Sequence, residues 1–169
     1  MILPLPDSKR SERMRQILQQ EVVPTLRELG FRGTMPHFHR RRHDRLDLLN
    51  LQFSQNGQYF FINLGRIQLP HDRTGSIEKP TRKHLSLANC PIDQRTRLAI
   101  GALPKRLGGG RRPGFDMWDF FSEADTESDE LMHKLARQLR EWLSPCADPW
   151  WRDEKLKGDR WKIDPGLIS

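Results

Sequence analysis

The chain has 169 residues, of which 36% are hydrophobic and 30% charged, and its formal net charge is +7. A chain of this length fits one domain with one core, and no apolar run approaches the roughly 20 residues that a membrane-spanning helix needs. The N-terminal residues are apolar only briefly and lack the basic lead of a secretory signal. Cys90 and Cys146 show neither a metal-ligand spacing nor a disulfide framework. We therefore expect a cytoplasmic protein without a membrane segment, a metal or a cofactor.

The charge is unevenly distributed along the chain. Residues 1–112 carry a balance of +12, whereas residues 113–169 carry a balance of −5. Such an asymmetry is typical of a chain whose basic half binds a polyanion. The simpler interpretation is that a basic half packs on an acidic half and that the two largely cancel.

The first predicted element is a helix over residues 8–29, after a tail at residues 1–7 that contains two prolines. Apolar residues recur in this segment every three to four positions, as on the core-facing side of an amphipathic helix: Met14, Ile17, Leu18, Val22, Leu26 and Leu29. Gly30 is expected to end the helix. Pro24 is expected to kink it, because proline removes one backbone hydrogen bond.

The middle of the chain predicts a β-hairpin. Asn56-Gly57 lies between two runs rich in Leu, Phe and Ile, which is typical of a two-residue hairpin turn. This turn would pair Gln55 with Gln58, and it would set three pairs on the core face: Phe53 with Phe60, Leu51 with Ile62, and Leu49 with Leu64. Asp47 would then lie opposite Arg66, as a pair of opposite charges.

The remaining elements complete an antiparallel sheet. A strand over residues 35–42 is expected to join through a tight turn at His43-Asp44, with Phe38 opposite Leu49. Residues 70–92 are expected to form a long excursion, residues 95–103 a further strand, residues 104–114 a basic Gly-rich loop, and residues 117–121 a short last strand. A second amphipathic helix is expected over residues 125–143.

These elements predict an α+β fold in which four or five antiparallel strands carry two main helices on one face. We expect a single domain over residues 8–148. The tryptophan-rich segment 149–169 is expected to wrap back over it, since bare tryptophans are poorly soluble.

The hairpin register also predicts a polar set on the second face of the sheet. Asn50 lies opposite Asn63, Gln52 opposite Phe61, and Leu48 opposite Gly65. The neighbouring strands would add His37, His39, Arg95 and Arg97. Amides, imidazoles and guanidinium groups together suit an anion or a carboxylate, and Gly65 would let a ligand or a backbone approach closely. The alternative is an ordinary solvated sheet face.

Metal binding and catalysis find little support in the sequence. His37, His39 and His43 could share a strand face, but no carboxylate or cysteine joins them, and arginines 40–42 would repel a cation. There is no nucleophile elbow, no Cys-His pair with an orienting group and no close carboxylate pair on a predicted strand. Cys90 is interpreted as a packing residue.

Nucleic-acid binding is an open alternative. The run from His39 to His43 and the basic residues of the 104–114 loop could contact phosphates, and Tyr59 and Phe61 could stack on bases. Charged edge strands and loops are also ordinary solubility devices.

Several short motifs resemble the bacterial domain-of-unknown-function family 4304 over residues 12–143. They are Leu-Arg-Glu-Leu-Gly-Phe at 26–31, Asn50-x-Gln52-x-Ser54, Asn63-x-Gly65, a cysteine followed by Arg95-x-Arg97, and Trp118. The chain departs from the resemblance at Asp116-Met117-Trp118-Asp119, where that family tends to have Asp-x-Trp-Trp. The resemblance implies no activity, but its motif residues are mostly those of the second sheet face, to which it adds Trp118.

The leading hypothesis is a non-enzymatic domain, of the immunity or accessory type, that binds another protein through the polar sheet face. Its positive charge would suit an acidic partner. The second hypothesis is nucleic-acid binding through the basic surface and the 104–114 loop, and the third is an enzyme that acts on a small anion.

Overall fold

The computed structural model describes residues 7–91, 94–97, 118–119, 125–144 and 151. The helices are α1 (Asp7–Glu21), α2 (Val23–Glu28) and α3 (Asp125–Trp142), with a short 3-10 helix η1 (Leu87–Asn89). The strands are β1 (Arg32–Thr34), β2 (His37–Arg42), β3 (Arg45–Phe53), β4 (Tyr59–Gln68), β5 (Arg95–Arg97) and β6 (Trp118–Asp119). They form one antiparallel sheet in the order β1-β2-β3-β4-β5, and β6 pairs with β4.

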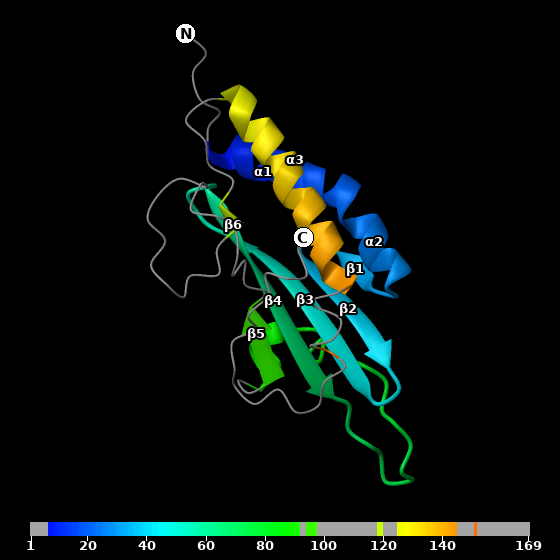
Figure 1. Cartoon of the computed structure of the whole chain (residues 1–169). Coiled ribbons are helices and arrows are strands. Elements are labelled where there is room, and N and C mark those ends of the chain that lie inside the picture. The colour runs from blue at the N-terminus through cyan, green and yellow to red at the C-terminus, as the bar shows by residue number, and fades with distance from the viewer. Residues whose placement is uncertain (1–6, 92–93, 98–117, 120–124, 145–150, 152–169) are drawn as a thin grey trace.

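The α+β class, the antiparallel sheet and the two main helices on one face are confirmed. Figure 1 shows α1, α2 and α3 in one layer along one side of the sheet. Among the described residues, no helix combines the length and hydropathy needed to cross a membrane. The 104–114 loop, most of the strand expected over 95–103 and the segment beyond Trp151 lie outside the described residues.

The predicted N-terminal helix is divided near Pro24, as expected. α1 ends at Glu21, and α2 begins at Val23 with Pro24 in its first turn, where a missing N–H costs least. α2 then ends at Glu28, and Gly30, two residues later, has a φ of +89°. The N–H of Phe31 donates to the carbonyl of Leu26 at 2.9 Å, which satisfies a terminal carbonyl and turns the chain toward the sheet.

The hairpin register is confirmed, but the connection is wider than the two-residue turn that was predicted. Phe53 pairs with Phe60, Leu51 with Ile62, and Leu49 with Leu64. The β3–β4 ladder ends at the pair of Phe53 and Phe60 and does not continue to the expected pair of Gln55 and Gln58. Of the turn residues only Gly57 has a positive φ. Instead, the hydroxyl of Ser54 accepts the N–H groups of Gln58 and Tyr59 and closes a wider loop. The register is the predicted one because the wider loop is still centred on Asn56 and Gly57.

The other strand predictions hold where the chain is described. β2 pairs with β3 so that Phe38 faces Leu49, and His43 adopts a positive φ of 46° in the tight turn between the strands. β1 is an extra short strand that pairs with β2. β5 and β6 lie within the two segments predicted to form the last strands.

The main core lies between the helices and one face of the sheet. It includes Phe38, Phe60 and Ile62 of the sheet, which meet buried residues from all three helices. Helix α3 buries Met132, Leu135, Ala136 and Leu139, and Leu143, directly after the helix, is also buried. Trp151, 0% exposed, packs against Phe31 with 4.9 Å between ring centroids, so this part of the C-terminal segment belongs to the core.

Only part of the second face of the sheet is exposed, because a second apolar cluster covers the rest of it. Leu46, Leu48 and Ile67 point to this face and form a second cluster with Leu69 and Cys90. Leu85 and Leu87, from the excursion after β4, pack against the cluster. Figure 1 shows that this segment extends beyond the end of β4 before it returns to the sheet.

An ion pair joins α1 to α3 and predicts how stability depends on pH. Nε and Nη2 of Arg13 donate to the carboxylate of Asp129 at 2.7 and 2.9 Å, and this bond holds the pKa of Asp129 below its ordinary value. A lowered carboxyl pKa stabilises the fold above the unfolded-state value of about 3.9, and this contribution is lost as the pH falls through the folded-state value.

We therefore expect Asp129→Asn to lose less stability than the wild type on acidification below about pH 5, in urea unfolding followed by circular dichroism. The difference in unfolding free energy between the variant and the wild type should be small, because the side chains of Arg13 and Asp129 are 38% and 45% exposed. Arg13→Gln should flatten the acid limb in the same way. Parallel pH profiles for the wild type and both variants would contradict the assignment.

Candidate functional site

The exposed half of the second sheet face carries a hydrogen-bonded network of amides, which we call the amide face. Asn63 Nδ2 donates to Asn50 Oδ1 at 3.2 Å and to Gln52 Oε1 at 3.1 Å. Asn50 Nδ2 in turn lies 3.0 Å from His37 Nδ1. Three neighbouring strands thus contribute to one network. The register pairs Asn50 with both His37 and Asn63, and Gln52 lies two residues farther along β3 on the same face.

Aromatic and basic residues border the amide face. Tyr59 and Phe61 project from β4 on the same side, with their rings edge to face at a centroid distance of 5.5 Å. On the far side of β4, Arg97 pairs with Asn63, and Arg95 pairs with Gly65. The register therefore assigns both arginines to the second face, and the Arg95 side chain is exposed.

Three further predicted site residues lie neither in this network nor among the residues that border it. His39 is half-buried beside β1, where burial lowers its pKa and the positive charge of Arg27 lowers it further. Trp118 pairs with Phe60, a residue of the core face, so its register position is on the other side of the sheet.

Gly65 is the third. A Cβ atom there would come within 2.5 Å of Leu87 Cδ2 and 3.2 Å of Cys90 Sγ. Because Gly65 has no side chain, the segment that contains Leu87 and Cys90 can pack closely against this part of the second face. Cys90 is a packing residue, since its buried Sγ lies 3.1 Å from the carbonyl oxygen of Arg66.

A buried charge cluster, which the sequence did not reveal as such, lies at the end of the helix-side face. Asp47 is 0% exposed, and its Oδ2 accepts two hydrogen bonds from Arg40, at 2.8 and 3.0 Å. Arg42 Nε lies 2.8 Å from the same oxygen, and Arg45 Nε lies 3.4 Å from Oδ1. Arg66, 3% exposed, pairs with Asp47 across the ladder.

Burial raises the pKa of Asp47, and the surrounding guanidinium groups act in the opposite direction. Arg40 also donates to the carbonyl of Leu29 at 3.0 Å and lies over the rings of Phe31 and Trp151, at 4.7 and 5.3 Å from their centroids. Two arginines of the basic run 39–43 are thus directed to a buried carboxylate. The signal in the sequence was the predicted register, which puts Arg40, Asp47 and Arg66 in one row.

Metal binding finds no support in the described part of the chain, where no group of three or more His, Cys, Asp or Glu side chains could hold an ion. The two histidines of β2 have different surroundings: His37 joins the amide face, and His39 lies beside β1.

Comparison with known proteins identifies the family and nothing more specific. Neither the curated proteins nor the solved structures gave a match to this chain. The family model described as "Domain of unknown function (DUF4304)" matches residues 22–153, which include the whole sheet, α3 and Trp151. The chain therefore belongs to the DUF4304 family.

Proposed function

We propose that this chain is a non-enzymatic protein-binding domain, of the immunity or accessory type, whose amide face contacts the partner. The observation that carries the proposal is the network of His37, Asn50, Gln52 and Asn63. Its side chains are held in place by one another before any partner arrives, so little conformational entropy would be lost on binding.

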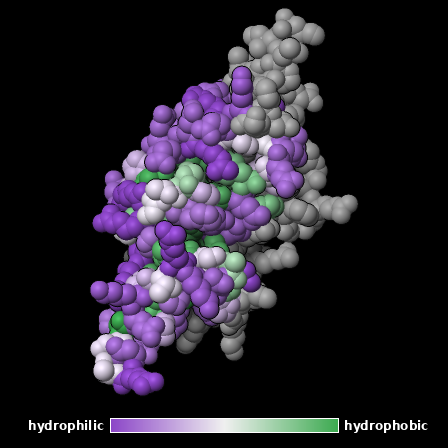
Figure 2. Space-filling model, turned by 180° about the vertical axis from the view of Figure 1, so that it is seen from behind, coloured by the Kyte–Doolittle hydropathy of each residue, from purple (hydrophilic) through white to green (hydrophobic). Residues whose placement is uncertain are grey.

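The composition of this surface favours a protein over a nucleic acid. The centre of a protein interface is depleted in charged residues and enriched in aromatic ones, and the amide face has uncharged amides flanked by Tyr59 and Phe61. Seen from behind, the described surface is mostly hydrophilic, with hydrophobic residues in small areas only (Figure 2). Such a surface suits a polar interface rather than an obligate hydrophobic one.

The charge cluster weakens the nucleic-acid alternative. Of the basic run, Arg40 and Arg42 are both bound to Asp47, so their guanidinium groups are less accessible to phosphates than the sequence suggested. The aromatic pair and Arg95 are the features that still favour single-stranded nucleic acid. On the protein-binding proposal, Arg95 would lie at the rim and contact acidic residues of the partner.

The test is a pull-down from native lysate with tagged protein, with and without nuclease treatment, followed by identification of the retained material. We expect the retained material to include a protein that stays bound after nuclease treatment. Its binding should weaken only gradually as the salt concentration rises. Retained material that disappears with nuclease, or whose affinity falls steeply with salt, would instead assign the surface to nucleic acid.

Variants connect the partner to this surface. Gln52→Arg puts a bulky charge at an exposed position of the amide face and is expected to weaken binding of the identified partner about tenfold or more in a titration. Gln20→Arg makes the same change at an exposed position of α1, so it should bind as the wild type does. Equal binding by both variants would exclude the amide face as the contact surface.

A further inference from the structure

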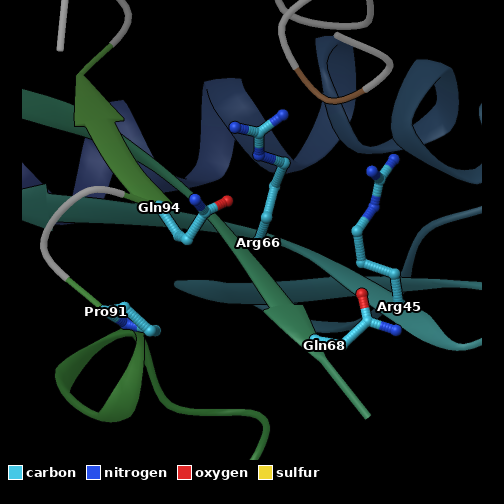
Figure 3. A pocket seen from close by; sticks show the side chains of 5 residues that line it. All are labelled: Arg45, Arg66, Gln68, Pro91 and Gln94. Carbon is cyan, nitrogen blue, oxygen red and sulfur yellow. The ribbon is translucent and has the colours of Figure 1, made fainter. Parts of the chain in front are cut away.

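A separate pocket of about 460 Å³ lies at the end of the sheet where β3 begins and β4 ends. Its lining residues come from β3, β4 and the approach to β5: Arg45, Arg66, Gln68, Pro91 and Gln94. Figure 3 shows the side chains of Arg45 and Arg66 extending in the same direction from neighbouring strands. The pocket volume is in the range of about 300–1,000 Å³ that is typical of small-molecule sites.

The side chain of Arg45 is held by contacts to two other residues. Arg45 Nε lies 3.4 Å from Asp47 Oδ1, and its Nη2 donates to the backbone carbonyl of Trp151. These contacts leave Nη1 of Arg45 without a hydrogen-bond partner among the described residues. Arg66, the second arginine of the lining, is 3% exposed, and its backbone carbonyl accepts a hydrogen bond from Cys90 Sγ at 3.1 Å.

Charge and hydrogen-bonding groups together specify the kind of ligand. Guanidinium groups match the geometry of phosphate and carboxylate oxygens, and two of them in the lining of one pocket favour a doubly charged anion over a singly charged one. Gln68 and Gln94 add amide groups that can both donate and accept hydrogen bonds, which suits hydroxyl groups next to the anion.

We propose that this pocket binds the phosphate group of a small phosphate monoester, with Arg45 and Arg66 on the phosphate and the two glutamines on the rest of the ligand. This site is independent of the proposed protein-binding surface. Arg45 and Arg66 share a strand face with Leu49 and Leu64, whereas the amide face is on the other side of the sheet.

Isothermal titration calorimetry at low salt tests the proposal on the full chain with four probes: ribose 5-phosphate, ribose, inorganic phosphate and succinate. We expect ribose 5-phosphate to bind most tightly, inorganic phosphate more weakly, and ribose not at all. Binding of succinate as tight as that of ribose 5-phosphate would overturn the assignment to phosphate, and the absence of binding by any probe would overturn the site.

Variants locate the binding. Arg45→Gln should weaken ribose 5-phosphate binding about tenfold or more, because hydrogen bonds to charged groups are the stronger class. Gln94→Ala, a milder change, should weaken ribose 5-phosphate more than inorganic phosphate. Arg41→Gln removes the same charge from an exposed arginine opposite Leu46 on the second face, and it should leave binding unchanged.

Two results would contradict this location of the site. In the first, the Arg45→Gln variant binds ribose 5-phosphate as tightly as the wild type does. In the second, Arg41→Gln weakens the binding as much as Arg45→Gln does. The partner titration described above separates the two proposals. Gln52→Arg should leave ribose 5-phosphate binding intact, and Arg45→Gln should leave partner binding intact.

Discussion

Replacing Asp47 with asparagine is expected to lower the free energy of unfolding by about 3–5 kcal/mol, which is the range for removing one partner of a buried ion pair. The carboxylate is fully buried and contacts Arg40, Arg42 and Arg45 at 2.8, 2.8 and 3.4 Å. Asparagine has nearly the same shape but no charge, so the guanidinium groups would lose their counterion without leaving the interior. Urea unfolding at pH 7, followed by circular dichroism, measures the change.

Asp44→Asn is the matched control for this prediction. Asp44 lies in the turn between β2 and β3, three residues from Asp47, and its side chain is 39% exposed. The same chemical change there should leave the unfolding midpoint close to that of the wild type. If Asp47→Asn were as stable as Asp44→Asn, the buried cluster would contribute nothing to the fold.

Replacing Trp151 with alanine is expected to cost about 3–5 kcal/mol of unfolding free energy, the usual range for deleting a buried aromatic side chain. Trp151 is 0% exposed, and it lies against Phe31 and the guanidinium group of Arg40. Its loss would leave a cavity next to the charge cluster and remove a contact between the C-terminal segment and the start of the sheet. Urea unfolding measures this effect, with Trp151→Phe expected to retain most of the stability.

Tyr59→Ala is the comparison for Trp151→Ala, because it also deletes an aromatic ring, but at a half-exposed position of the amide face. It should destabilise the protein much less than Trp151→Ala. Equal losses for the two variants would show that the packing of Trp151 gives no special contribution to the core.

The sequence alone determined those parts of this protein that depend on local periodicity. The 3.6-residue spacing of apolar residues in the first 30 positions, together with Pro24 and Gly30, predicted α1, the break before α2 and the end of that helix. Alternation around Asn56-Gly57 predicted the register of β3 and β4, since a shift of one residue would expose every core side chain. That register brought Asn50, Gln52 and Asn63 together before the structure was known.

Tertiary structure decided what lies against each face of the sheet. The segment that covers Leu46 and Leu48 has no periodic pattern, so neither its path nor the consequence for Gly65 could be read from the sequence. The charge cluster depends on three strands and on Trp151, which is separated from Arg45 by 106 positions. Its arginines look like surface charge in the sequence, because burial of an ion is set by distant neighbours that exclude water rather than by adjacent residues.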